Sequence, residues 1–183
     1  LVFDGRNHIP LMTLPGMRNR CIRISSAGKT FSMTGWKVGY SVGSRELLTA
    51  AAKAHQFLTF ATPPNLQKAV AYGLNKDECY FKNLGKQMEI KRNLLAMGLA
   101  EIGFEVMDSQ GTYFLTTDFR PLGFNGDDVE FCMHMISKAG VAALPFSAFY
   151  QDRVINHYVR FCYCKQDSLL DAALEKIKVY FDD

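Results

Sequence analysis

The sequence has 183 residues, of which 48% are hydrophobic and 21% charged, so it has enough apolar material for a packed core and the charge content of a globular chain. The formal net charge is +3 at pH 7, and no dense run of Lys and Arg marks a nucleic-acid-binding surface. No apolar stretch approaches the roughly 20 residues of a membrane-spanning helix. We therefore expect neither nucleic acid nor membrane as a partner.

The first segment, Leu1–Gly5, reads like the middle of a strand followed by a turn, and it does not begin with Met. We expect no signal peptide, because a basic segment followed by an apolar run and a cleavage site is not seen. We also expect the chain to be a fragment of a longer protein. A processed or trimmed chain is the alternative.

The first part of the chain alternates between strand-like and helix-like segments. Residues 21–26 predict a strand that runs into a turn of small residues, and residues 36–43 predict a second strand. A stripe of Leu and Ala predicts a helix over about 45–58. Thr62-Pro63-Pro64 ends that helix and starts another, for which Thr62 can be the cap and a Pro suits the first turn, and which carries apolar residues up to Leu74.

A long helix is predicted over about 77–102, where Gly103 suits the left-handed residue that ends it. A helix of this length with much polar surface often bridges two lobes, so we predict domains at 1–78 and 79–183. Beyond it we predict strands and helices mixed, with Asp127 and Asp128 as turn and cap residues. The predicted strands are 104–107, 112–117, 141–144 and 158–164, and the predicted helices are 128–138 and 168–181.

Five cysteines are present, without a CxxC pair, so neither a zinc site nor a redox motif is supported and we expect no metal. Cys162 and Cys164 lie in an apolar run and would share one face of a strand, so we predict that both are buried small hydrophobes. Reduced thiols favour an intracellular location, with the cytoplasm preferred and a mitochondrion or plastid as alternatives.

One string in the sequence carries chemistry: residues 25–40, SSAGKTFSMTGWKVGY, place a lysine in a turn of small residues after a strand. The triplet Gly28-Lys29-Thr30 matches the end of a phosphate-binding loop for ATP. The first glycine of that motif would fall at Arg23, and a strand-like segment follows where the motif needs a helix. The sequence therefore disfavours ATP binding but keeps it as an alternative.

A second interpretation makes Lys29 the lysine that binds pyridoxal phosphate. A lysine forms an imine with an aldehyde only when its amine is neutral, and a dry pocket or a second cation favours the neutral form. Lys37 could be that cation and balance the cofactor phosphate, to which Ser26 offers a hydroxyl. A lone lysine in such a turn is more often simply solvated, so the whole string must carry the argument.

That string resembles the lysine signature of the class I, fold-type-I aminotransferases that depend on pyridoxal phosphate. A small residue precedes Lys29, and eight residues later come Lys37, Val38 and Gly39. Most members have Arg at the Lys37 position, and the form with Lys is most similar to the kynurenine aminotransferase, glutamine transaminase K and methionine aminotransferase-like branch. Further segments resemble the same family along the chain. They are Leu11–Met17, Gln110–Phe114, Gly140–Tyr150 and Tyr158–Cys162.

The resemblance implies an α/β fold, namely the end of the large-domain sheet and the small C-terminal domain of a fold-type-I transferase. It implies an aminotransferase that moves an amino group between an amino acid and a 2-oxo acid, through a pyridoxal phosphate Schiff base on Lys29. Ser26 and Lys37 would anchor the cofactor phosphate. A homodimer is implied too, in which Phe60 reaches the neighbouring subunit's site, although Phe60 as a bare residue fits a core better.

Arg160 matches the family's substrate-carboxylate arginine, and it is also a lone charge within an apolar, strand-like run. Such a charge needs a partner, and its planar fork suits a carboxylate. A structural ion pair or an edge-strand arginine is the alternative from the residues alone.

Related enzymes are longer at the N-terminus, where they carry an Asp that pairs with the cofactor's ring nitrogen. We therefore expect the isolated chain to have little activity. Alternatives for the function are a cysteine-conjugate β-lyase on the same scaffold, the ATP-binding protein, and a non-catalytic remnant that acts only through subunit contacts.

Overall fold

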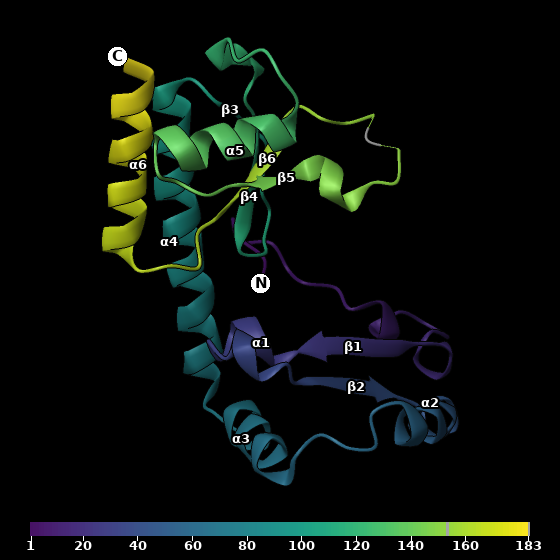
Figure 1. The fold of residues 1–183 in the computed structure, drawn as a ribbon. Coiled ribbons are helices and arrows are strands. Elements are labelled where there is room, and N and C mark those ends of the chain that lie inside the picture. Colours follow the sequence, from purple (N-terminus) through teal and green to yellow (C-terminus); the bar gives the residue numbers. More distant parts are fainter. Residues whose placement is uncertain (153, 183) are drawn as a thin grey trace. The chain divides into compact units, whose positions relative to one another are not determined.

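The computed structural model describes residues 1–152 and 154–182, which form two compact units (Figure 1). One unit is Asn7–Leu84, and the other combines Leu1–Arg6 with Gly85–Asp183. No helix among the described residues is both long enough and apolar enough to cross a membrane. The domain division predicted at residue 78 stays a prediction.

The unit Asn7–Leu84 is built on a pair of antiparallel strands, β1 (Ile22–Ser26) and β2 (Gly39–Gly43), with Ser26 opposite Gly39. The remaining regular elements are one-turn or longer helices. They are α1 (Ala27–Thr30), α2 (Arg45–Leu58) and α3 (Pro64–Leu74), with short 3-10 turns at Leu11–Thr13, Arg18–Arg20 and Thr34–Trp36.

The predictions for this unit are confirmed for the helix at 45–58, which begins after Ser44, whose hydroxyl accepts a hydrogen bond from Leu47 N. The predicted strand at 36–43 begins only at Gly39, because the 3-10 turn ends at Trp36 and Lys37 has a left-handed backbone with φ +53°. The core is small. It consists of Ala27, Val38 and Val70, with Phe31, Met33, Tyr40 and Leu66 packed against them.

The other unit is a four-stranded antiparallel sheet with helices, in the spatial order β3-β4-β6-β5. The long helix α4 (Glu78–Ile102) begins in the first unit and ends before Gly103, which has the predicted left-handed φ of +112°. The other elements are β3 (Glu105–Val106), β4 (Phe114–Asp118), α5 (Asp128–Lys138), β5 (Leu144–Pro145), β6 (Tyr158–Cys162) and α6 (Asp167–Asp182), with 3-10 turns at Arg120–Leu122 and Phe146–Phe149.

Aromatic rings fill the core of this unit. Phe131 of α5 is fully buried and stacks on Phe119 with ring centroids 4.3 Å apart, and Phe104 meets Phe131 and Phe161 edge to face. These arrangements are the favourable ones for ring quadrupoles. In β6 the side chains alternate: Val159 and Phe161 are buried, whereas Tyr158, Arg160 and Cys162 face the other side and are half-buried.

The helices α4 and α6 run alongside each other in Figure 1. They approach closely at Gly98, where an added Cβ would lie 2.5 Å from Leu174 Cδ1. A side chain larger than hydrogen therefore has no room at this crossing.

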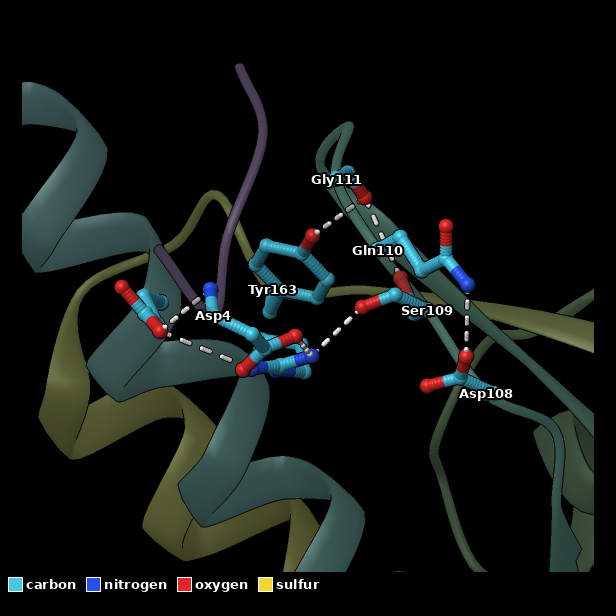
Figure 2. Close-up of polar contacts among 8 residues, drawn as sticks. Asp4, Asp108, Ser109, Gln110, Gly111 and Tyr163 are labelled. Atoms are coloured by element: carbon cyan, nitrogen blue, oxygen red, sulfur yellow. Dashed lines mark hydrogen bonds and ion pairs between the residues drawn. The ribbon is translucent and has the colours of Figure 1, made fainter. Parts of the chain in front are cut away.

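The segment Leu1–Arg6 is held in this unit by a polar network (Figure 2). Phe3 is buried, and its N–H donates to Gln110 O at 3.0 Å. Arg92 of α4 donates two hydrogen bonds to the Asp4 carboxylate, at 2.6 and 3.1 Å, and a third to Ser109 O at 2.5 Å. Those hydrogen bonds lower the pKa of Asp4 below its ordinary value, and they raise the pKa of Arg92.

The Asp4–Arg92 pair makes the stability of this unit depend on pH. Since the pKa of Asp4 is lower in the folded state than in the unfolded state, its contribution is present above about pH 4 and is lost as the pH falls through the folded pKa. We expect Asp4→Asn to lower the free energy of unfolding at pH 7, and this deficit to shrink as the pH falls below about 4. Urea unfolding at several pH values measures it.

Asp108→Asn is the matched control, because Asp108 lies in the same network but accepts only from the Gln110 amide. Its unfolding free energy should follow that of the unsubstituted chain at every pH. A deficit of Asp4→Asn that stays constant down to pH 3 would contradict the assignment.

Candidate functional site

The lysine turn is fixed on both sides of Lys29. Ser26 ends β1 and caps α1, because its Oγ accepts a hydrogen bond from Gly28 N at 3.2 Å. Ala27 N donates to Val38 O at 3.0 Å, which ties the turn to the residues before β2. Ala27 and Gly28 are buried, whereas Lys29 is exposed.

Gly28 has a steric reason for its small size. An added Cβ would lie 3.1 Å from Thr34 Cα and 3.3 Å from Ser26 Oγ, so a larger residue would push against the cap that shapes the turn. The predicted turn at 25–28 is thus the end of β1 joined to a one-turn helix. The small residues of this turn let the strand and the helix join without a steric clash.

Lys37 lies at the same end of the β1–β2 pair as Ser26 and Lys29. The register places Ser26 opposite Gly39, and Lys37 precedes Gly39 by two residues with its side chain exposed. The pairing of β1 with β2 therefore places the backbones of these three residues, which are up to eleven apart in the sequence, at one end of the strand pair.

The ATP interpretation of Gly28-Lys29-Thr30 finds no support in this geometry. The helix α1 ends at Thr30 after four residues, and a left-handed Ser32 and a 3-10 turn follow. A phosphate-binding loop leads into a longer helix whose N-terminal N–H groups face the phosphates.

Phe60 is not a core residue. Its side chain is 79% exposed, and its backbone is left-handed with φ +64°. It lines an open pocket of about 470 Å³ with residues from β2 and α3, among them Tyr40 and Val70. An exposed phenylalanine on a strained backbone is costly unless another surface covers it.

Arg160 lies on β6, which has β4 on one side and β5 on the other, so it is not an edge-strand arginine. Its guanidinium lies between two rings: Cζ is 3.5 Å from the ring centroid of Phe114 and 4.6 Å from that of Phe149. Phe114 reaches it as the diagonal neighbour across the β4–β6 pair, because Thr116 is the residue directly opposite.

No carboxylate pairs with Arg160 among the described residues, and its Nε is buried without a hydrogen-bond partner. Arg92 and Arg120 in the same unit differ, because each is paired with an aspartate at 2.6 Å. The described residues therefore give no support to a structural ion pair of Arg160. A guanidinium that packs against rings keeps its hydrogen-bond donors available for an anion.

The sequence did not single out Phe114 and Phe149 as neighbours of Arg160. Phe114 could have been found from the strand pattern. Once two predicted strands are paired, each residue has a definite diagonal neighbour on the facing strand. Phe149 sits in a 3-10 turn whose direction no periodicity reveals.

The cysteines include one, Cys132, that is buried in the core of the C-terminal unit. Burial, with the nearby charge of Asp128, raises the pKa of the Cys132 thiol to about 12, so this residue stays a neutral thiol at ordinary pH. Cys162 and Cys164 are half-buried rather than buried as predicted, because β6 ends at Cys162 and does not carry both on one strand face, and their Sγ atoms lie 3.2 Å apart.

Comparisons with known proteins agree with this architecture. The model of the family described as aminotransferase class I and II matches residues 4–177. A probable N-succinyldiaminopimelate aminotransferase of Mycobacterium tuberculosis is 44% identical over 98% of this chain and 47% of its own length. The kynurenine–oxoglutarate transaminase of Dictyostelium discoideum is 36% identical over 97% of this chain and 45% of its own.

Solved structures show the same fold. The structure of N-succinyldiaminopimelate aminotransferase from Mycobacterium tuberculosis superposes with a TM-score of 0.92 at 45% identity, over 98% of this chain and 47% of that one. The methionine aminotransferase structure from Escherichia coli gives 0.90 at 36% identity, over 98% and 47%. The α/β fold is therefore that of the C-terminal part of a fold-type-I transferase.

The chain belongs to the class I and II aminotransferase family, whose members depend on pyridoxal phosphate. The prediction of the family from the lysine string is confirmed, including its likeness to kynurenine transaminases and methionine aminotransferase. The chain spans about half the length of the curated relatives it matches.

Proposed function

We propose that this chain is the C-terminal half of an enzyme that moves an amino group between an amino acid and a 2-oxo acid with pyridoxal phosphate. One observation carries the proposal: the Arg160 guanidinium packs against two rings and has no carboxylate partner among the described residues, whereas Arg92 and Arg120 of the same unit are each paired with an aspartate. Family membership supplies the reaction class, and the lysine turn supplies a group that the cofactor requires.

The residues of the lysine turn fit the cofactor. Lys29 offers an amine for its aldehyde, while the Ser26 hydroxyl and the Lys37 ammonium group suit a phosphate. Bound there, pyridoxal phosphate would serve as an electron sink for the charge left when a substrate loses a proton from its α-carbon. Lys29 would hold the cofactor covalently through Nζ.

Lys29 would also move the proton of the reaction. Its Nζ would accept the proton from the substrate α-carbon as a general base and later return it as a general acid. The turn restrains the Lys29 backbone through the Ser26 cap and the bond from Ala27 N to Val38 O. A restrained backbone lowers the entropy that must be lost to place Nζ beside the substrate α-carbon.

Arg160 would orient the substrate. Two parallel N–H···O bonds from its fork to the α-carboxylate would fix both the position and the rotation of the amino acid. The ring centroids of Phe114 and Phe149 lie 3.5 and 4.6 Å from its Cζ, and the apolar surface of these rings would strengthen the ion pair with the carboxylate.

A second copy of the chain would complete the site. Phe60 is exposed on a strained backbone, which supports a contact with another subunit and hence a homodimer in which it reaches the neighbouring site. Amino and 2-oxo acids are the proposed substrates. An intracellular location stays a prediction.

The first test maps the cofactor lysine. We expect pyridoxal phosphate followed by borohydride to label Lys29 selectively, since the turn presents it beside groups that suit a phosphate, and an amino acid to compete with the label. Peptide mapping by mass spectrometry locates the label. Lys53→Ala is the control, because Lys53 is exposed on α2 and should leave the pattern unchanged.

Lys29→Ala should remove this label altogether. Equal labelling of many surface lysines, both in this chain and in a longer protein that contains it, would contradict the cofactor assignment.

The second test concerns the isolated chain. We expect its transamination to be negligible, because the chain corresponds to 45–47% of the length of its relatives and the group that pairs with the cofactor's ring nitrogen is not among its assigned residues. Formation of 2-oxo acid, assayed against a longer protein with the N-terminal half restored, measures it. Turnover by the isolated chain equal to that of the longer protein would refute the expectation.

The third test separates charge from geometry at Arg160. In the longer protein we expect Arg160→Lys to lower kcat/KM for an amino acid by about 100-fold, because an ammonium keeps the charge but loses the two-pronged hold. The same substitution should lower kcat/KM far less for the corresponding amine, because the amine lacks the carboxylate. Arg45→Lys, on the exposed start of α2, is the control.

An equal loss for the amino acid and the amine would show that Arg160 does not read the carboxylate.

A further inference from the structure

Asp128 is a buried carboxylate that no step of the proposed reaction uses. It is the first residue of α5 and is fully buried, but it makes no ion pair among the described residues. Both of its oxygens accept hydrogen bonds from one residue, Ser147: Oδ2 from the backbone N–H at 2.6 Å, and Oδ1 from Oγ at 2.8 Å.

The neighbouring Asp127 shows that Asp128 is not needed as a helix cap. Asp127 Oδ1 accepts from Val129 N and Glu130 N, and Glu130 Oε2 in turn accepts from Asp127 N, which completes a capping box. The helix N-terminus favours a negative charge at Asp128, yet a carboxylate buried without a cation remains expensive. Such a group is retained where it fixes a geometry.

The geometry that Asp128 fixes is the turn Phe146–Phe149. Ser147 is buried in this turn, and its carbonyl accepts from Tyr150 N at 3.1 Å, which closes the turn. Phe149, two residues after Ser147, is the outer ring over the Arg160 guanidinium and is 58% exposed. A ring so exposed has few packing contacts of its own, so its direction depends on the turn that carries it.

We propose that Asp128 is a positioning residue for substrate binding: through its two hydrogen bonds to Ser147 it holds Phe149 against Arg160. We call Phe114, Phe149 and the Arg160 guanidinium the aromatic clamp. Strand pairing sets the position of Phe114, and Asp128 sets that of Phe149. This inference rests on the proposed function, in which Arg160 binds the substrate carboxylate. It adds an explanation of how the Arg160 guanidinium is kept in the orientation that binding a carboxylate requires.

The test measures how well the clamp shields Arg160 in this chain, without any need for turnover. Phenylglyoxal modifies accessible guanidinium groups, and peptide mapping by mass spectrometry gives the rate at each arginine. We expect Asp128→Asn to raise the rate at Arg160 about tenfold, since an amide cannot accept both bonds from Ser147 and a buried donor is left unsatisfied. The rate at exposed Arg45 is the internal reference.

Asp127→Ala is the matched control. It removes the adjacent carboxylate and so weakens the cap of the same helix, but it leaves the bonds to Ser147 in place. Its rate at Arg160 should stay within about twofold of the unsubstituted chain, as expected for a loss confined to helix capping. An increase equal to that of Asp128→Asn would overturn the proposal, because general loosening of α5 would then explain both.

A double-variant cycle shows whether Asp128 acts through Phe149. Phe149→Ala alone should raise the rate at Arg160 by a similar factor, and Asp128→Asn should add little on that background. If the two substitutions together raise the rate at Arg160 by the product of their separate factors, the proposal is overturned. If Asp128→Asn fails to fold, Ser147→Ala takes its place in the cycle, since it removes the Oγ bond and keeps the backbone bond.

A final measurement distinguishes this inference from the proposed function. In the longer protein loaded with cofactor, 3-phenylpropionate should protect Arg160 from phenylglyoxal, and the neutral 3-phenylpropionamide should not. Failure of the carboxylate to protect would contradict the role of Arg160, whereas the rates in the chain alone would still decide the clamp. Protection that persists unchanged in Asp128→Asn, with an unchanged rate, would contradict the positioning role only.

Discussion

The alternation of side chains along β6 is the constraint on which the C-terminal unit depends. Val159 and Phe161 enter the aromatic core, so Tyr158, Arg160 and Cys162 must face the opposite side. The strand is held between β4 and β5 and cannot shift by one residue without exchanging the two sets. Burial of two apolar residues thus fixes the direction of a charged one, without any contact between that charge and the core.

Three arginines among the described residues of this unit show that the same type of side chain can have different structural roles. Arg92 joins Asp4 to α4 and ties distant parts of the chain together. Arg120 lies mostly in solvent but covers the buried carboxylate of Asp118, whose pKa falls below its ordinary value because the bonds from Arg120 outweigh burial. Arg160 is held by rings alone, and a cation held by rings keeps its hydrogen-bond donors available.

Sequence patterns predicted the helices well, because each repeats over several turns and begins or ends at a recognisable residue. The helices at 45–58 and 128–138 are confirmed to the residue, and Gly103 ends α4 as expected. The short strands were predicted too long: the one expected at 141–144 is only Leu144–Pro145. Two-residue strands exist because neighbouring strands pair with them, which local propensity does not encode.

The candidate site was predictable where a chemical motif lies in one string, as around Lys29, and from a charge in an apolar run, as at Arg160. The groups that shape it were not. Asp127 and Asp128 are chemically identical and adjacent, yet the first caps a helix in the ordinary way and the second is bonded to Ser147, nineteen residues away. Only the tertiary fold separates two such roles.

The attachment of Leu1–Arg6 to the C-terminal unit has a consequence for the order of folding. Asp4 and Arg92 are 88 residues apart, so the whole unit Asn7–Leu84 is an insertion within the other one. Closing a flexible loop of that length costs roughly 4 kcal/mol in chain entropy, beyond a constant term. Any structure that forms within Asn7–Leu84 shortens the flexible part of this loop, so it lowers the chain entropy that the Asp4–Arg92 contact must offset.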